Sequence, residues 1–299
     1  MLSEATRAWI EGATGGRVTG ATRIRAATSC LMHEVEIEAA SEKRHFFLRR
    51  FTDEAWVKRE PDIALRESAS LEHARRAGLP TPMLRAVDST GERCGVPATL
   101  VTKVPGQVVL SPTNPDTWVT GLARAAALVH RVEASGFRWK YRRYNEGEPL
   151  TVPAWSQNPR AWQKAIDVVN GPPPSFSECF VHRDYHPSNV LWDGDRVSGI
   201  VDWVNGCRGP AGIDVAWCRH NLANLHGVAM ADEFLEEYIN TAGSNFEYDP
   251  YWDLMSVVEL LPGPPSMYDA WRIAGYPSIS NALMRERVDA YVASVVARL

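Results

Sequence analysis

The sequence of 299 residues has no run of about 18 apolar residues, the length that a membrane-spanning helix needs. Its first residues, MLSEATRAWIEGATGG, lack the basic-then-apolar layout of a secretory signal. The five cysteines are scattered and form no CxxC pair, which argues against a disulfide framework or a structural zinc site. A formal net charge of -4 argues against nucleic acid as a partner. We therefore expect a cytoplasmic protein, monomeric or homodimeric, with no membrane or nucleic-acid partner.

The first third of the chain has the pattern of a small sheet with one helix. Three segments are rich in β-branched or alternating apolar residues, and the segment CGVPATLVTKV predicts a further strand at 94–104. Between them, good helix formers follow a proline and end at Gly78, which predicts a helix from about 62 to 77. The three strand segments are 16–27, 31–38 and 44–51.

The character of the sequence changes after residue 106, where apolar residues recur at helical spacing. Trp118, Leu122, Ala125 and Val129 are the first such set, and we expect further helices at 212–226, 229–242, 250–260 and 281–298. The sequence therefore predicts an α+β, bilobal protein with two domains. Residues 1–103 would form a small N-terminal lobe with an antiparallel sheet, and residues 104–299 a larger, mainly helical lobe.

Polar side chains that can do chemistry are concentrated in the segment CFVHRDYHPSNVLWDGDRVSGIVDW at 179–203. An Asp-Gly pair between two apolar runs predicts a β-hairpin there. Asn189 enters this hairpin and Asp202 leaves it, so we expect their oxygens to lie close together and to bind Mg²⁺. Asp184 precedes Asn189 by five residues, and its carboxylate could accept the proton of an attacking hydroxyl.

The order His182-Arg183-Asp184, then Asn189, then Asp202 has the spacing of a kinase catalytic loop followed by its metal-binding aspartate. A zinc hydrolase is an alternative, because His182, Asp184 and His186 alternate as ligands on a strand would. Against it, Pro187 follows at once and no second histidine cluster occurs. We therefore favour phosphoryl transfer over metal-assisted hydrolysis.

A kinase of this kind needs a cation on its third strand, paired with a glutamate on the next helix. The segment FFLRRF offers Arg49 or Arg50, which face opposite sides of a strand, and Glu67 is the expected partner with Glu72 as its rival.

The loop that should cover the phosphates contains no glycine. It has the sequence AATSC at 26–30, so the Ser29 hydroxyl and backbone amides would have to bind them. The glycine-rich segment GATGG at 12–16 fits neither GxGxxG nor a Walker A motif, and we expect a plain loop there.

Over nearly its whole length the chain resembles the aminoglycoside phosphotransferase family, the small-molecule branch of the protein-kinase-like fold. The segments that carry the resemblance are LRR at 48–50, LRESASLEHARRAGLPTP at 65–82, VTKVPG at 101–106, LVHRV at 128–132, VHRDYHPSNVLW at 181–192, SGIVDW at 198–203 and GPAGIDVAW at 209–217. A protein kinase is a weaker match. Asp202 is followed by Trp-Val instead of Phe-Gly, and no APE motif or activation segment follows.

The resemblance implies a role for each matching residue. Asp184 would be the catalytic aspartate, and Asn189 and Asp202 the Mg²⁺ ligands. Arg49 stands where the family carries a phosphate-binding Lys or Arg, and Glu67 would be its ion-pair partner.

The resemblance also implies roles outside this set. Asp214 would buttress the catalytic loop. Residues 99–103, with Val101 and Lys103, would form the hinge that binds the purine through backbone groups.

We therefore expect a Mg²⁺-dependent enzyme that transfers the γ-phosphate of ATP or GTP to a hydroxyl of a small molecule, with antibiotic resistance as one biological role. Residues 228–299 carry eleven acidic residues against four basic ones, which favours a cationic acceptor such as an aminoglycoside or an amino alcohol. The eleven tryptophans could equally line an apolar pocket for a macrolide-like compound. The alternative is a catalytically silent nucleotide or ligand binder on the same fold.

Overall fold

The computed structural model describes residues 2–25, 30–40, 42–76 and 78–299. The chain divides into two compact units. Unit 1 comprises Met1–Gly106 and Ser198–Asn205, and unit 2 comprises Gln107–Val197 and Gly206–Leu299. The chain therefore enters unit 2 after Gly106 and returns to unit 1 for one short segment, which contains Asp202.

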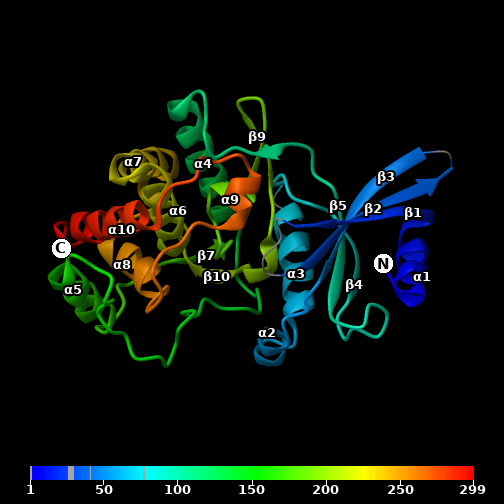
Figure 1. The fold of residues 1–299 in the computed structure, drawn as a ribbon, viewed down its shortest axis with the longest axis horizontal. Coiled ribbons are helices and arrows are strands. Elements are labelled where there is room, and N and C mark those ends of the chain that lie inside the picture. Colours follow the sequence, from blue (N-terminus) through cyan, green and yellow to red (C-terminus); the bar gives the residue numbers. More distant parts are fainter. Residues whose placement is uncertain (1, 26–29, 41, 77) are drawn as a thin grey trace. The chain divides into compact units, whose positions relative to one another are not determined.

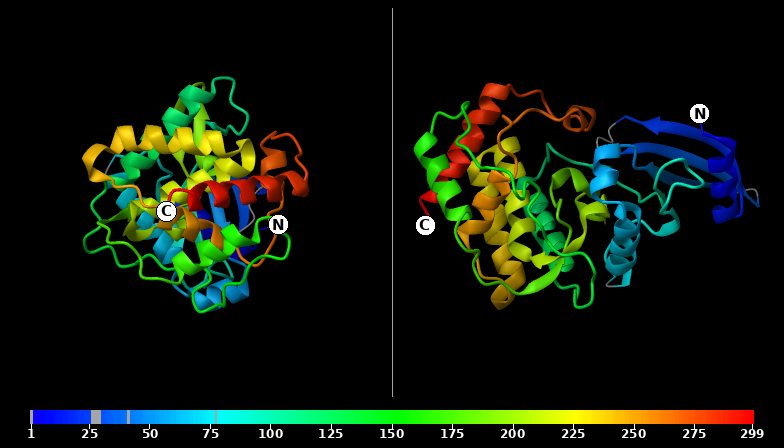
Figure 2. Two further views of the ribbon diagram at one scale, coloured as in Figure 1. Left: turned by 90° about the vertical axis from the view of Figure 1, so that its left-hand side faces the viewer. Right: turned by 90° about the horizontal axis from the view of Figure 1, so that it is seen from below.

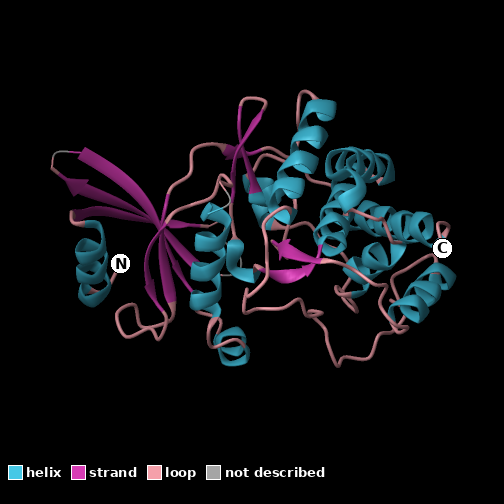
Figure 3. Ribbon diagram, turned by 180° about the vertical axis from the view of Figure 1, so that it is seen from behind, coloured by secondary structure: helices cyan, strands magenta, loops and turns pink. Residues whose placement is uncertain are grey.

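Unit 1 is built on a five-stranded antiparallel sheet with the strand order β1-β2-β3-β5-β4. Figure 1 labels these strands, and Figure 3 shows them as one twisted sheet. Alternate residues point into a core that includes Val35, Ile37, Phe46 and Leu48. The five strands are β1 (Arg17–Ile24), β2 (Leu31–Ala39), β3 (Glu42–Arg50), β4 (Leu84–Asp88) and β5 (Ala98–Thr102).

The described residues of unit 1 form three helices, where we expected one: α1 (Glu4–Thr14), α2 (Glu54–Arg59) and α3 (Ile63–Arg76). The helix predicted at 62–77 is confirmed as α3. The loop expected at 12–16 is wrong in part, because the last turn of α1 reaches Thr14. Ser3 caps the start of α1 by accepting a hydrogen bond from the Thr6 N–H, and Gly15 ends it in the left-handed conformation at φ 69°.

Unit 2 is mainly helical, and most of its helices, coloured from green to red, gather together in Figure 2. α6 is buried along nearly its whole length, which is typical of a helix surrounded by other helices. All four helices predicted after residue 206 are confirmed, whereas α5 and α9 were not predicted. The helices are α4 (Pro115–His130), α5 (Pro159–Val169), α6 (Ala211–His226), α7 (Val228–Ala242), α8 (Pro250–Val258), α9 (Asp269–Ile273) and α10 (Asn281–Val296).

Short strands and 3₁₀ turns carry the polar segment of the sequence. β7 (Glu178–Val181) pairs with β10 (Cys207–Pro210), and β6 (Gln107–Val108) pairs with β8 (Val190–Asp193). The predicted hairpin is confirmed: β8 turns at Gly194 into β9 (Arg196–Ile200), along which the chain passes from unit 2 into unit 1. The 3₁₀ turns are η1 (Pro187–Asn189), η2 (Trp203–Asn205) and η3 (Gly243–Asn245).

None of the helices formed by the described residues is long and apolar enough to cross a lipid bilayer.

Candidate active site

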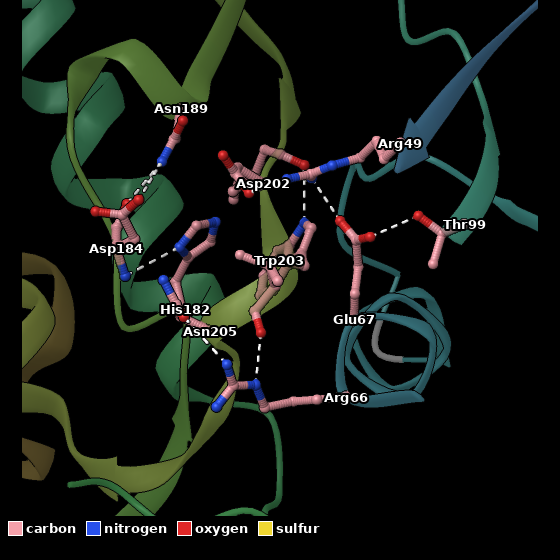
Figure 4. A network of polar contacts seen from close by, with 12 residues as sticks. Arg49, Arg66, Glu67, Thr99, His182, Asp184, Asn189, Asp202, Trp203 and Asn205 are labelled. Carbon is pink, nitrogen blue, oxygen red and sulfur yellow. Dashed lines mark hydrogen bonds and ion pairs between the residues drawn. The ribbon is translucent and has the colours of Figure 1, made fainter. Parts of the chain in front are cut away.

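Arg49 is the centre of a buried polar cluster in unit 1. It lies on β3, and its guanidinium donates from Nη1 to Glu67 Oε1 at 2.5 Å and from Nη2 to Asp202 Oδ1 at 2.6 Å. The other carboxylate oxygen of Glu67 accepts a hydrogen bond from the Thr99 hydroxyl at 2.6 Å. Figure 4 shows the guanidinium between the two carboxylates. One cation therefore bridges two acidic side chains that come from separate segments of the chain.

The structure shows which of the two expected glutamates pairs with Arg49. Arg49 pairs with Glu67 of α3, whereas the rival Glu72 of the same helix interacts with Arg75 at 3.9 Å. Burial alone would lower the pKa of Arg49, but the charges of Asp202 and Glu67 outweigh it and hold that pKa above its ordinary value. Arg49 is therefore a permanent cation.

Asp202 is held in place through the turn that follows it. Its backbone has φ 66°, an uncommon left-handed conformation for an aspartate. Arg66 of α3 donates from Nε to the Val204 carbonyl at 2.6 Å and from Nη2 to Asn205 Oδ1 at 3.3 Å. The Trp203 indole N–H donates to the Ile200 carbonyl at 2.9 Å. The helix that supplies Glu67 therefore also anchors the segment that supplies Asp202.

Cys30 belongs to the same cluster, although the sequence analysis did not identify it. It packs beside the buried residues Phe51, Ile63 and Val204. Burial raises the pKa of the Cys30 thiol, and the charge of Asp202 raises it further, so the thiol stays protonated. No sequence signal singles out Cys30, because its burial results from contacts with residues far from it in the chain.

Asp184 is the centre of a second polar group, which lies in unit 2. Its Oδ1 accepts a hydrogen bond from the Trp217 indole N–H at 2.9 Å. The Asn189 amide donates to the Asp184 carbonyl at 2.8 Å and to Oδ2 at 3.3 Å, and Figure 4 shows the amide nitrogen turned toward Asp184. The Asp184 side chain keeps 27% of its surface exposed. This carboxylate is oriented by neutral donors and remains accessible.

Asp214 supports the loop that carries Asp184. It is completely buried on α6 and accepts hydrogen bonds from the backbone N–H groups of His182 at 2.6 Å and Arg183 at 2.7 Å. Burial would raise the pKa of Asp214, but the hydrogen bond with His130 and the nearby histidine charges outweigh it and hold the pKa below its usual value. A buried carboxylate thus fixes the backbone just before Asp184, the buttress role that the resemblance implied.

Arg183 is a further anchor that sequence reasoning missed. It has φ 69°, and its guanidinium lies 3.8 Å from the ring centroid of Tyr144 and 4.8 Å from that of Tyr141. Its Nη2 donates to Glu259 Oε1 at 2.6 Å, just beyond the end of α8. Both side chains of this ion pair are almost fully buried. The side chain before Asp184 is therefore locked into the helical part of unit 2.

The zinc alternative finds no support among the described residues, where no group of three or more His, Cys, Asp or Glu is arranged to hold a metal ion. His186 instead begins η1, and its ring accepts a hydrogen bond from the Ser188 N–H at 3.3 Å. Its Nε2 lies 3.6 Å from Asp184 Oδ1.

Asn189 and Asp202 offer the oxygen donors that Mg²⁺ prefers. Because the Asn189 amide nitrogen faces Asp184, its oxygen points the other way, as Figure 4 shows. Mg²⁺ in phosphoryl-transfer sites needs only one or two protein oxygens besides the substrate phosphates, so these two residues fit it. They lie in different units, and their sharing of one ion stays a prediction.

Three predicted nucleotide-binding residues remain. Ser29 lies outside the described residues. Val101 lies within β5, buried between Phe47 of β3 and Leu84 of β4. Lys103 follows β5, where its backbone N–H donates to the His45 carbonyl at 3.3 Å and its Nζ pairs with Glu34 at 2.9 Å. Phosphate binding by Ser29 and purine binding at Val101 and Lys103 stay predictions.

Comparison with solved structures identifies the fold as α+β and protein-kinase-like. The structure resembles the aminoglycoside phosphotransferase APH(4)-Ia with a TM-score of 0.62, 15% identity and coverage of 97% of this chain and 98% of that one. It also resembles the amicoumacin kinase hAmiN, solved with AMP-PNP, Ca²⁺ and Ami, with a TM-score of 0.60, 14% identity and coverage of 93% and 88%.

The family model of the phosphotransferase enzyme family matches residues 35–258, and the chain belongs to this family. Among curated proteins, the homoserine kinase of Sinorhizobium medicae is 28% identical over 170 residues, which are 50% of each chain. The homoserine kinase of Brucella ovis is 27% identical over 167 residues, 50% of this chain and 49% of that one. The match thus spans about half the length of these curated relatives. The family predicted from the sequence is confirmed.

Proposed function

We propose that this chain is a Mg²⁺-dependent kinase that transfers the γ-phosphate of ATP or GTP to a hydroxyl of a small molecule. The observation that carries the proposal is the orientation and accessibility of the Asp184 carboxylate. Its carboxylate is oriented by the Trp217 and Asn189 hydrogen bonds, stays accessible, and sits on a backbone fixed by Asp214. A general base must be both positioned and open to its substrate.

In the proposed reaction Asp184 accepts the proton of the acceptor hydroxyl while the acceptor oxygen bonds to the γ-phosphorus. The bond between that phosphorus and the oxygen that bridges it to the β-phosphate breaks, and the nucleoside diphosphate leaves. Arg49, kept charged by its two carboxylate partners, would bind the nucleotide phosphates. Asn189 and Asp202 would hold Mg²⁺, which neutralises phosphate charge when bound.

Several acceptors are consistent with the comparisons. The two curated relatives named above are homoserine kinases, and a solved structural neighbour, a thermostable mutant of APH(4)-Ia, forms a complex with ADP and hygromycin B. We propose a hydroxyl compound of low molecular mass that carries an amino group, because homoserine and aminoglycosides share that feature and residues 228–299 are rich in acidic side chains.

The test is γ-phosphate transfer from labelled ATP and GTP, with Mg²⁺, to a panel of homoserine, hygromycin B, other aminoglycosides, macrolides, choline and sugars. Asp184→Ala should lower turnover by about 10²- to 10⁴-fold without weakening nucleotide binding. Asp193→Ala is the matched control, because Asp193 is an exposed aspartate on β8, nine residues after Asp184 in the chain.

Equal turnover in Asp184→Ala and the wild type would overturn the assignment of the base. Wild-type protein that binds Mg-nucleotide but transfers phosphate to no member of the panel, and releases none to water, would favour the silent binder.

A further inference from the structure

Trp217 lies on α6, and its indole N–H points at the proposed base. The Nε1 to Asp184 Oδ1 distance is 2.9 Å, and the Trp217 side chain is buried. Trp217 follows Asp214 by three residues on the same helix, so both reach the catalytic loop from one helix face. Asp214 holds the backbone of that loop, whereas Trp217 contacts the reacting carboxylate itself.

The indole is held rigidly by its neighbours. The Tyr144 ring meets it edge to face at a centroid distance of 5.7 Å, and the His220 ring does so at 6.1 Å. The Arg183 guanidinium lies 5.8 Å from its centroid. Because these contacts fix the plane of the ring, the direction of the N–H is fixed as well.

The Trp217 hydrogen bond is also the firmer of the two anchors on the Asp184 carboxylate. The Asn189 amide reaches Oδ2 at 3.3 Å, which is near the limit for such a bond. Asn189 is a proposed metal ligand as well, so its position depends on the bound ion. The indole N–H is a donor only and binds no metal.

A buried indole N–H does not always have a hydrogen-bond partner in this protein. Among the described residues, the buried Nε1 atoms of Trp118, Trp155 and Trp192 have no hydrogen-bond partner. The fold thus accepts unpartnered indoles elsewhere, while Trp217 is aimed at a functional carboxylate.

We propose that Trp217 is a positioning residue for phosphoryl transfer, which fixes the Asp184 carboxylate so that its second oxygen faces the acceptor hydroxyl. The inference rests on the proposed function of Asp184. A displaced base loses rate because proton transfer requires hydrogen-bond reach and alignment, whereas nucleotide binding does not use this carboxylate.

The test compares Trp217→Phe with Trp162→Phe. Trp162 of α5 is a matched control, because its buried indole N–H also donates to a carboxylate, Asp289 Oδ1 of α10, at 2.7 Å. Both variants lose one indole–carboxylate hydrogen bond and keep an aromatic ring. We expect Trp217→Phe to lower kcat about 10- to 100-fold with an unchanged KM for the nucleotide, and Trp162→Phe to leave both constants near the wild-type values.

Turnover would be measured with the acceptor identified in the panel, or as phosphate release to water. A kcat for Trp217→Phe within twofold of the wild type would overturn the proposal. Equal losses in Trp217→Phe and Trp162→Phe would also overturn it, because they would reflect general damage to unit 2.

A second measurement does not depend on activity. The indole ¹H–¹⁵N resonance of Trp217 is assigned by its absence in Trp217→Phe, and it should move upfield in Asp184→Ala while the Trp162 resonance stays in place. An unmoved Trp217 resonance would refute the hydrogen bond and the inference with it. Absence of transfer by the wild type, together with a resonance that does move, would instead count against the proposed function.

Discussion

The polar groups of the two units differ in how they hold their acidic side chains. In unit 1 the carboxylates of Glu67 and Asp202 share one buried cation, Arg49. In unit 2 the carboxylate of Asp184 accepts hydrogen bonds from a neutral indole and a neutral amide. Within the part of the chain that the structure describes, Asp184 has an ion-pair geometry to His186, at 3.6 Å, and His186 is charged only if it is protonated.

This difference matches the two roles proposed above for Arg49 and Asp184. A cation bridged by two carboxylates stays charged and oriented, which suits the binding of phosphates. A carboxylate held by neutral hydrogen-bond donors keeps its direction while part of it stays exposed, which would suit a group that accepts a proton from a substrate. One ion pair of unit 2 starts at the residue before Asp184, where Arg183 pairs with Glu259 and holds the loop.

Removing the cation of unit 1 should give the largest effect. Arg49→Met leaves Glu67 buried without its counter-charge, so we expect the free energy of unfolding to fall by about 3–5 kcal/mol. Mg-nucleotide binding should weaken roughly 10- to 100-fold. Urea unfolding and a fluorescent nucleotide analogue measure the two quantities.

Arg50→Met is the control, because Arg50 is the next residue on β3 and faces the other side of the sheet. A loss of less than about 1 kcal/mol in Arg49→Met would show that the bridge in unit 1 is no more stabilising than a surface ion pair.

Acid should weaken unit 2 through His220, which is buried on α6 and stacks on Tyr291 of α10. Burial lowers the pKa of His220 to about 4, below the ordinary value of 6.5. Between these values the unfolded chain binds a proton that the folded chain does not, so stability falls as the pH falls from about 6.5 to 4. The loss should reach about 3 kcal/mol at pH 4.

His220→Phe should remove this component. The measurement is the change in unfolding free energy between pH 7 and pH 4 in each protein, since the difference between two pH values cancels the direct packing effect of the substitution. Identical changes in the wild type and the variant would contradict the prediction.

The features that were predicted correctly from the sequence depend on residues that lie close together in the chain. The Asp-Gly turn, the cap at Gly78 and the helical spacing in unit 2 depend on neighbouring residues, and each produced the expected hairpin or helix. The pairing of Arg49 with Glu67 is also present, because strand and helix geometry limit which partners can meet. By contrast, α1 was missed because an isolated helix signal near a glycine-rich segment is weak.

The supporting contacts of the candidate site could not be predicted, since they join distant segments. Trp217 lies 33 residues from Asp184, and Glu259 lies 76 residues from Arg183. Any of eleven tryptophans could have supplied that N–H as far as the sequence is concerned. Only the packing of α6 against the loop that carries Asp184 selects one of them.

Within unit 2, Glu259→Gln tests the buried ion pair that holds the loop before Asp184. The substitution keeps the shape of the side chain but removes the charge opposite Arg183, so we expect a loss of about 2 kcal/mol in unfolding free energy. Glu178→Gln is the control, because Glu178 pairs with Arg208 at 3.3 Å on a more exposed surface and should lose little. Equal losses in the two variants, measured by urea unfolding, would contradict the assigned role of the buried pair.

Thr99→Val should give the smallest effect and separates the contributions within unit 1. The buried hydroxyl of Thr99 donates to Glu67 Oε2 at 2.6 Å, so its loss leaves one carboxylate oxygen without that donor while the Arg49 pair remains. We expect a loss of about 1 kcal/mol in unfolding free energy, measured in urea.

Thr102→Val is the control. It lies on the same strand and removes a hydroxyl that accepts a hydrogen bond from the exposed Met83 N–H at 2.9 Å. Nucleotide affinity should stay unchanged in both variants. Thr99→Val would contradict this expectation if it weakened nucleotide affinity as much as Arg49→Met does. In that case the Thr99 hydroxyl, and not the Arg49 cation, would be the main determinant of how Glu67 is held.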